Sequence, residues 1–369
     1  MIKENRITSL DGLRGIAVLV VIAFHYINNQ ILDNSWFLNR FGKPALILQK
    51  ITYFGWSGVD LFFVLSGFLI GNILLRNKNS PSLFKTFYIR RFFRIIPAYY
   101  LLLIIFFILT ITPLYDERAD IFNWHIPLAS YFLFIQNFYM AQYNHFGPHA
   151  LTPTWSLCVE EQFYLIIPFL VFITNKKYAW MFAVGGLVLA IICRQLSTNF
   201  YQGYTLLPSR IDTPMVGFLI AWLHQYPQFR DWISKHLSWM WGSLSVLVFA
   251  SILFYIKSDP GIFGHTLLAM VFGLMVIIAL YSKKGLYVKL LSVPFLLEMG
   301  KLSYFIYLYH MIINGLLHLL LLRQLVPAFD GYQSITITVA AFIITCLLAV
   351  LSFRFLEKPV IQYSHQFKY

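Results

Sequence analysis

The most regular feature of the sequence is a series of long apolar stretches separated by short polar ones. A membrane-spanning helix needs about 20 mostly apolar residues, and ten stretches meet this requirement. Their approximate limits are Leu10–Asn28, Phe54–Leu75, Phe92–Pro113, Trp155–Thr174, Tyr178–Arg194, Leu206–Leu223, Trp239–Ile256, Phe263–Tyr281, Ser303–Leu322 and Ile335–Phe355. The apolar stretch Ile126–Met140 is shorter and is expected to be re-entrant or interfacial. The pattern predicts an all-α, polytopic membrane protein.

Composition supports this class and excludes several others. Hydrophobic residues make up 59% of the 369 residues and charged residues 12%, against roughly 45–50% and about 25% in ordinary soluble proteins. A soluble enzyme, a disordered chain and a disulfide scaffold are therefore excluded. The first apolar stretch contains Asp11 and Arg14 and has no small-residue cleavage site after it, so we expect a retained span. We expect one transmembrane domain over residues 1–369, with no appended soluble domain.

The distribution of basic residues predicts the orientation. With ten spans and a cytoplasmic N-terminus, 19 of the 28 Lys and Arg lie in cytoplasmic segments and seven outside, while Arg14 and Arg210 fall within spans. This bias follows the positive-inside rule, so both termini are predicted to be cytoplasmic. The same rule explains the net charge of +13, and nucleic-acid binding is not expected. The long segment Leu114–Thr154, with His125, His145 and His149, is then outside.

Ionisable residues within spans are expensive and mark functional sites by default. Arg14 and His25 are 11 residues apart, which in an α-helix is about three turns, so they are predicted to share one face. Arg14 would lie near the cytoplasm and His25 toward the outside. Lipid-headgroup contact for Arg14 and simple packing for His25 are the structural alternatives.

Other ionisable residues fall at these two depths. The outer group contains Asp60, Glu160, Glu161, Arg210 and Asp212, and the inner group contains Arg90, Arg91 and Arg94. The inner arginines would bind a polyanion such as a cofactor's phosphates, although ordinary cytoplasmic positive charge explains them as well. The outer His and Glu would transfer protons.

The chain resembles the membrane-bound acyltransferase family 3, bacterial enzymes that acylate cell-envelope glycans. The family's elements appear in order across residues 8–359. They are Arg14 to His25 in LDGLRGIAVLVVIAFHY, Phe62–Gly67 in FFVLSG, Arg91 to Arg94, Trp155–Tyr164, Ser209–Asp212, Gly300–His310 and Phe355–Pro359. Many family members add an extracytoplasmic esterase-like domain. Without one, direct acylation of the final acceptor is left open.

The resemblance implies acetyl-CoA as the donor co-substrate. Arg14, Arg91 and Arg94 would hold its nucleotide end, with Arg90 and Lys301 as further candidates, and Ser66 would contact the pantetheine arm. Small-residue helix packing at Ser66 and Gly67 is the alternative.

On the acceptor side, His25 would be the general base. Glu160 would orient its imidazole or bind the sugar. The acceptor is expected to be lined by Asp60, Trp155, Arg210 and Asp212, and a structural ion pair is the alternative for the charged members. Tyr304 and His310 are weaker candidates, for which packing is the simpler interpretation. Cys158 as an acyl relay is disfavoured because buried apolar thiols are generally inert. No metal motif such as H-E-x-x-H occurs, so no metal is expected.

The predicted function is therefore that of a multi-pass O-acetyltransferase of the bacterial inner membrane, surrounded by lipid. Its acceptor would be an envelope polysaccharide or lipid-linked sugar of the O-antigen or exopolysaccharide type, and a succinyl donor is a possible variant. A transporter or flippase for acyl-CoA or a lipid-linked sugar is the main alternative, and a sensory or scaffold protein is the third. The sequence does not indicate the oligomeric state or a covalent acyl-enzyme.

Overall fold

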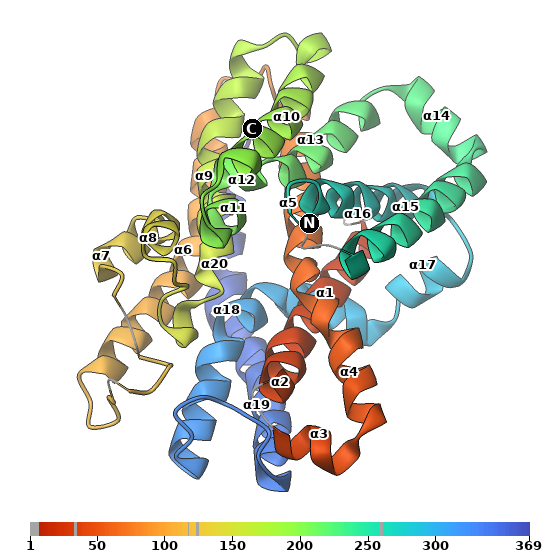
Figure 1. Ribbon diagram of the computed structural model, residues 1–369. Helices are drawn as coiled ribbons and strands as arrows, with labels where there is room; N and C mark the ends of the chain where they lie inside the picture. The colour runs from red at the N-terminus through yellow and green to blue at the C-terminus, as the bar shows by residue number, and fades with distance from the viewer. Residues whose placement is uncertain (1–6, 33–34, 117, 123–124, 258–260) are drawn as a thin grey trace. The chain divides into compact units, whose positions relative to one another are not determined.

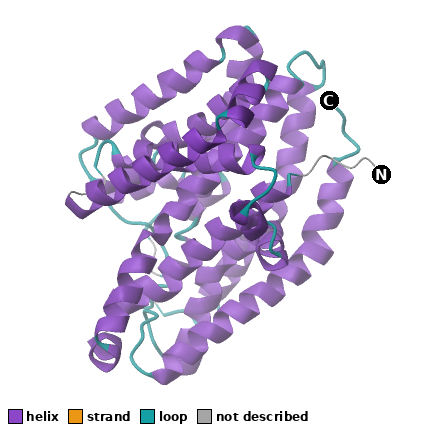
Figure 2. Cartoon of the chain, turned by 90° about the vertical axis from the view of Figure 1, so that its right-hand side faces the viewer, coloured by secondary structure: helices purple, strands orange, loops and turns teal. Residues whose placement is uncertain are grey.

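The computed structural model describes residues 7–32, 35–116, 118–122, 125–257 and 261–369. Within these ranges the chain consists of helices and connecting loops, without a β-strand (Figure 2). The all-α prediction is confirmed.

The α-helices differ widely in length and are labelled in Figure 1. Their limits are α1 Thr8–Ala23, α2 Asn29–Leu32, α3 Ser35–Phe41, α4 Lys43–Tyr53, α5 Gly58–Arg76, α6 Leu83–Thr110, α7 Leu128–Phe132, α8 Gln136–Tyr143, α9 Thr154–Ile173, α10 Trp180–Leu196, α11 Phe200–Thr205, α12 Leu207–Arg210, α13 Asp212–His224, α14 Pro227–Lys235, α15 Leu237–Lys257, α16 Gly264–Tyr281, α17 Leu286–Leu291, α18 Pro294–Leu322, α19 Tyr332–Ser352 and α20 Lys358–Ser364. Short 3₁₀ turns cover Phe54–Ser57, His149–Leu151 and Lys176–Tyr178, and π-helical turns cover Phe24–Asn28 and Phe353–Glu357.

Nine helical segments of the described chain are long and apolar enough to cross a membrane. Their limits are Thr8–Ile31, Lys43–Arg76, Leu83–Thr110, His149–Ile173, Lys176–Leu196, Leu237–Tyr255, Gly264–Tyr281, Pro294–Leu322 and Tyr332–Ser364. Each contains most of one predicted span. The chain is a multi-pass membrane protein by this criterion. The stretch Ile126–Met140 contains only short helices, α7 and the start of α8, which agrees with the expectation that it does not span.

The sixth predicted span, Leu206–Leu223, is wrong as a continuous helix. It divides into α12 and α13, with a break at Ile211. Proline explains the break, because its ring clashes with the carbonyl four residues before it in a helix interior. For Pro214 that carbonyl belongs to Arg210. Starting a new helix at Asp212 places Pro214 in a first turn, where proline is tolerated.

The residues form two compact units, each assembled from separate chain segments. The first unit contains residues 1–17, 59–83 and 158–301, and the second contains residues 18–58, 84–157 and 302–369. Three of the five boundaries fall in the interior of helices α1, α9 and α18, so these helices contribute to both units, and the other two fall after the first residue of α5 and of α6.

In the first unit, α13 packs against α10 and α16, and α16 packs against α15 (Figure 1). Glycines also bring α5 against α13. A Cβ atom at Gly67 would lie 1.9 Å from the Pro214 carbonyl oxygen, and one at Gly217 would lie 2.0 Å from that of Val64. Gly71 follows Gly67 by four residues and meets Phe218 and Ala221. Small residues at this spacing allow helix backbones to approach closely in membrane proteins.

In the second unit, tyrosines join α6 to its neighbours. The Tyr309 hydroxyl on α18 donates to the Ala98 carbonyl, and the Tyr99 hydroxyl donates to that of Tyr131, both over 2.8 Å. Tyr99 and Tyr309 are buried. Buried phenols that keep a hydrogen bond combine apolar packing with a fixed register, so these contacts set the positions of α6 and α18.

Candidate functional site

The centre of the candidate site is a pair of histidines in the second unit. The α-helical hydrogen bonding of α1 changes at Ala23 to a π-helical turn, Phe24–Asn28, which contains His25. Single π-turns occur frequently at functional sites. His25 Nδ1 lies 2.8 Å from Nε2 of His310 on α18, and the two rings stack with centroids 5.0 Å apart.

The surroundings of His310 determine which nitrogens carry protons. Its Nδ1 lies 2.7 Å from the Tyr307 carbonyl oxygen and 3.2 Å from that of Ile306. Carbonyl oxygens can only accept, so Nδ1 of His310 carries the hydrogen. In a neutral imidazole the other nitrogen is then an acceptor. His25 therefore donates from Nδ1 to His310, and this leaves the lone pair of His25 on Nε2.

Two hydrogen bonds hold the segment of α18 that contains His310. The Tyr26 hydroxyl donates to the His310 carbonyl over 2.6 Å, and the hydroxyls of Ser156 and Tyr307 are 2.7 Å apart. His310 itself is fully buried. The residue that accepts from His25 is thus fixed by the π-helical turn, α9 and α18 together.

His25 lines a polar cavity of about 180 Å³. The cavity is built from the π-helical turn and α2, the segment around residue 120, the turn at residue 149, α18 and the loop that follows it. Its lining residues are His25, Asn29, Gln30, Asp120, His149, Asn314, Val326 and Pro327. Six of these eight side chains are polar, so the cavity beside His25 suits a ligand rich in hydrogen-bonding groups.

Glu160 and Ser66 lie together in the first unit. The Ser66 hydroxyl donates to Glu160 Oε1, and the Tyr164 hydroxyl donates to the same oxygen over 3.0 Å. In this structure the imidazole of His25 is oriented by His310, so the expected orienting role of Glu160 has no support here. Gly67, next to Ser66, packs directly against the backbone of Pro214. This favours the helix-packing alternative at Ser66 and Gly67, whereas a contact of Ser66 with the donor stays a prediction.

Asp60 and Arg210 form an ion pair in the first unit. Arg210 Nη2 donates to Asp60 Oδ1 over 2.7 Å, and both side chains are fully buried. His265 Nδ1 lies 3.7 Å from the same carboxylate oxygen. Breaking a buried ion pair is strongly destabilising because one charge is left without compensation. The geometry therefore favours the structural alternative for this pair.

A second buried pair joins Asp212 to Arg194. Their side chains are 2.9 Å apart, and Arg194 also donates to the carbonyls of Ser209 and Ile262 and to the Thr266 hydroxyl. Ser209 lies on α12 next to the helix break, so Arg194 satisfies a backbone group there. Non-helical backbone at membrane depth is tolerated where protein groups supply such bonds. This explains how the interrupted segment is held.

The remaining predicted residues lie in several helices. Arg14 is half-buried on α1 in the first unit, and Arg91 and Arg94 are half-buried on α6 in the second. Arg91 and Arg94 are three residues apart and share a helix face. The shared face predicted for Arg14 and His25 assumed α-geometry throughout, whereas His25 lies in a π-turn. Trp155 is buried at the start of α9.

The further candidates have structural contacts. The Arg90 guanidinium donates to the Phe367 carbonyl, and Lys301 pairs with Glu298 at 3.0 Å. The Tyr304 hydroxyl donates to the Ile95 carbonyl. These contacts agree with a packing role for Tyr304. For Arg90, they agree with a role in holding the backbone near Phe367.

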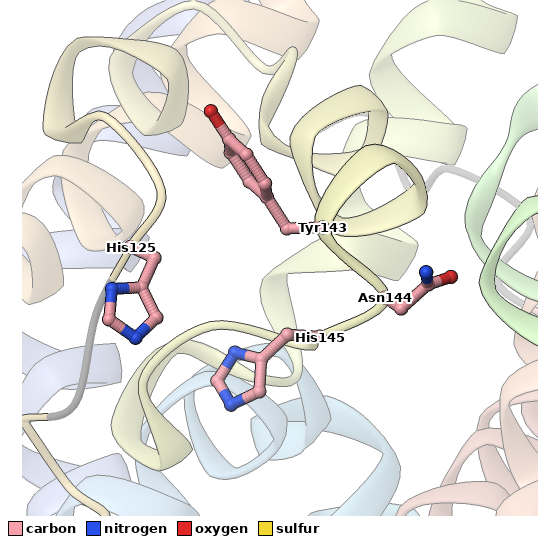
Figure 3. Close-up of a pocket in the computed structure, with 4 residues that line it drawn as sticks. All are labelled: His125, Tyr143, Asn144 and His145. Atoms are coloured by element: carbon pink, nitrogen blue, oxygen red, sulfur yellow. The ribbon is translucent and has the colours of Figure 1, made fainter.

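Another cavity, of about 580 Å³, lies in the second unit beside α8. Its lining residues are His125, Tyr143, Asn144 and His145 (Figure 3). The two imidazole centroids are 6.5 Å apart, and Nδ1 of His145 accepts from the Gly147 backbone N–H over 2.8 Å. His125, Tyr143 and Asn144 are exposed. This site lacks a buried, hydrogen-bonded pair of histidines like that of His25 and His310.

Sequence reasoning missed most of the cavity around His25. Asp120, Gln30 and Asn314 carried no motif, and His149 was noted only as part of a long loop. His310, at the end of the stretch GKLSYFIYLYH, was a weak candidate because packing is the simpler interpretation of such an aromatic stretch. A polar residue on an otherwise apolar span, such as Asn314 in α18, is the signal that could have identified the cavity.

The family comparison identifies the class of protein. A family model described as an acyltransferase domain matches residues 7–354. The chain belongs to the membrane-bound acyltransferase family 3. This confirms the resemblance that the motifs indicate, and the matched range includes His25, His310 and the cavity that His25 lines.

Two curated relatives of this acyltransferase show what the chain resembles. It is 31% identical over 376 residues to the peptidoglycan O-acetyltransferase OatA of Listeria monocytogenes, covering 96% of this chain and 56% of the relative. It is 26% identical over 379 residues to the O-acetyltransferase OatA of Staphylococcus aureus, covering 98% and 58%. The chain thus spans less than three fifths of either relative. No solved structure matches it.

Proposed function

We propose that this acyltransferase moves an acetyl group from acetyl-CoA to a hydroxyl of a cell-envelope glycan, with His25 as the general base. One observation carries the proposal. His25 donates from Nδ1 to the fixed acceptor of His310, so its basic nitrogen is Nε2, and His25 lines a polar cavity. Membership of an acyltransferase family supplies the reaction class.

The chemistry requires one proton acceptor at the hydroxyl. As the hydroxyl oxygen attacks the thioester carbonyl carbon, its proton passes to His25 Nε2. The carbon–sulfur bond then breaks, and the imidazolium returns the proton to the departing thiolate. An imidazole is suited to both steps near neutral pH. His310 accepts from His25 Nδ1 throughout and keeps the ring in one orientation.

The donor's phosphates need positive charge in the same protein. Arg91 and Arg94 share a face of α6, in the unit that also contains His25. Guanidinium groups bind phosphate through strong, charge-assisted hydrogen bonds. We therefore retain Arg91 and Arg94 as the phosphate contacts of acetyl-CoA.

The acceptor is proposed from the relatives. The Listeria relative is named for peptidoglycan, whereas the sequence alone favoured O-antigen or exopolysaccharide. Peptidoglycan is therefore the first glycan to assay, and the other envelope polysaccharides follow. The expected location is the bacterial cytoplasmic membrane.

Alkali-labile acetate on purified envelope glycans tests the proposal. Cells would express the wild-type protein, His25→Ala or His365→Ala, an exposed histidine near the end of the chain that serves as the matched control. General-base catalysis contributes about 10²–10⁴-fold. We expect ester acetate with the wild type and His365→Ala, and at least a hundredfold less with His25→Ala.

A second assay separates transfer from transport. Detergent-solubilised protein would be incubated with labelled acetyl-CoA and isolated peptidoglycan. Transfer of label to the glycan supports the proposal, and full transfer by a folded His25→Ala protein contradicts the general base. Membranes that translocate the label without releasing CoA would favour the transporter instead.

A further inference from the structure

The cavity beside His25 contains buried polar atoms that the described protein does not satisfy. Gln30 Nε2, Asn314 Oδ1 and His149 Nδ1 have no hydrogen-bond partner among the described residues. Gln30 and Asn314 are 1% and 2% exposed, and both line the cavity. Leaving such a group unpaired is costly, so a native protein is expected to pair it with something that enters the cavity.

These side chains are held in place by other contacts. Gln30 Oε1 accepts from the Thr338 hydroxyl over 2.9 Å, and the Gln30 carbonyl accepts from the Phe329 N–H. The backbone N–H of His149 donates to the backbone carbonyl of Asp120 over 3.0 Å. The cavity wall is therefore preorganised, which lowers the entropy lost when a ligand binds.

The segment that contains Asp120 is also fixed against α18. A Cβ atom at Gly315 would lie 2.9 Å from the Ile121 side chain, and Ile121 is fully buried. Gly315 follows Asn314 directly. The approach of the two chain segments thus places Asp120 and Asn314 in the same wall.

The available groups include donors and acceptors. Gln30 Nε2 donates, Asn314 Oδ1 and the Asp120 carboxylate accept, and His149 Nδ1 does either according to its tautomer. A hydroxyl both donates and accepts, so neighbouring hydroxyls on one ring match such a mixed set. A thioester or an acyl chain would leave most of these groups unpaired.

We propose that this cavity is the acceptor subsite and binds a single hydroxyl-bearing sugar ring, with Asn314 and Gln30 as the residues that determine its specificity. The inference rests on the proposed function and adds to it the class of acceptor unit. The volume of about 180 Å³ equals about six water volumes and lies below the roughly 300 Å³ of drug-sized pockets. One ring of the glycan enters, and the neighbouring rings stay outside.

Ligand-induced stabilisation tests the subsite without using catalysis. The full-length protein in detergent would be unfolded by heat with and without the methyl glycoside of N-acetylglucosamine, and with tetrahydropyran as the hydroxyl-free ring. A ligand that binds the native state raises the midpoint in proportion to its affinity. The sugar should stabilise the wild type, whereas tetrahydropyran should not.

Variants connect the stabilisation to the cavity. Asn314→Leu should weaken sugar binding about tenfold, because a hydrogen bond is lost and a sugar hydroxyl stays unpaired. Asn314→Asp, which retains an acceptor oxygen, should bind within about threefold of the wild type. Asn39→Leu, at an exposed position of α3 in the same unit, should behave as the wild type.

The outcomes separate this inference from the proposed function. No sugar stabilisation of the wild type, or equal stabilisation of a folded Asn314→Leu, contradicts the subsite and indicates a water-filled cavity. Sugar binding that depends on Asn314, without any acetyl transfer by the wild type, supports the subsite and contradicts the transferase. Transfer with an acceptor KM unchanged in Asn314→Leu contradicts the subsite alone.

Discussion

At the scale of single residues, the proton arrangement of the histidine pair is the most informative feature. Two backbone carbonyls fix the hydrogen on His310, and His310 in turn fixes the hydrogen on His25. In serine hydrolases a carboxylate positions the catalytic imidazole in a comparable way. Here the acceptor is a neutral ring, so the pair can be buried without the desolvation of a charge.

His310 is therefore a positioning residue, and its replacement should affect kcat more than KM. His310→Leu removes the acceptor of His25 Nδ1–H, so the unfavourable tautomer becomes populated and kcat should fall about 10²-fold or more. His310→Gln retains an acceptor and should recover most of this loss. Steady-state kinetics on acetyl-CoA and the glycan would measure both parameters.

A purely structural role for His310 predicts a different result. Both variants would then lose folded protein, and the kcat of the surviving fraction would equal that of the wild type. Size-exclusion profiles of the purified variants, measured beside the kinetics, distinguish these cases.

The sequence identified His25 because one motif contains it, but it did not identify its partner. His25 and His310 are 285 positions apart, and no local pattern records which buried residues meet across the fold. The expected orienting residue, Glu160, was a reasonable choice by depth alone. The sequence did not identify the cavity residues Asn314, Gln30 and Asp120 for the same reason, because a cavity is a property of tertiary packing.

At the scale of helices, glycine contacts determine how α5 meets α13. Gly67→Ala would place a methyl group 1.9 Å from the Pro214 carbonyl oxygen, so the two backbones must separate. Overpacking of this kind costs about 1–3 kcal/mol. We expect a lower thermal midpoint in detergent and less protein in the membrane.

Gly185→Ala on α10 is the matched control. Outside its chain neighbours and the nearby backbone of its own helix, no described atom lies within 4 Å of its Cβ position, and alanine has a higher helix propensity than glycine. Its midpoint should equal or slightly exceed that of the wild type. Equal midpoints for Gly67→Ala and the wild type would show that the contact is not tight.

Apolar stretches predicted nearly all of the long helices, because lipid requires every backbone group to be bonded within its own segment. The exception was Leu206–Leu223, where hydropathy was high but the helix breaks before Pro214. The proline signal was present in the sequence. What it could not show was that Arg194 and Asp212 would satisfy the backbone at the break.

At the scale of the whole molecule, the predicted orientation depends on the interrupted segment. The nine continuous spans of the described chain would place the two termini on opposite sides, whereas the sequence prediction of two cytoplasmic termini needs an even number of crossings. The structure and the predicted orientation agree if α11, α12 and α13 together form a tenth crossing of the membrane. Broken helices do so in membrane transporters.

Side-specific labelling tests this topology. Thr198→Cys, before α11, and Lys235→Cys, after α13, are exposed positions on either side of the interrupted segment. In a background lacking the three native cysteines, a membrane-impermeant maleimide on intact cells should label position 198 but not 235. Labelling of both or neither from outside would show that the segment does not cross.

The π-helical turn at Phe24–Asn28 also has a consequence for chain length. A π-turn accommodates one residue more than an α-helical turn, so it is equivalent to a single-residue insertion. If the same residues instead formed a regular α-helix, at 100° per residue, the residues that follow would be rotated by nearly 100° about the helix axis. The helix would survive, yet His25 and the cavity residues Asn29 and Gln30 would no longer face the same space. At this position the number of residues matters as much as their identity.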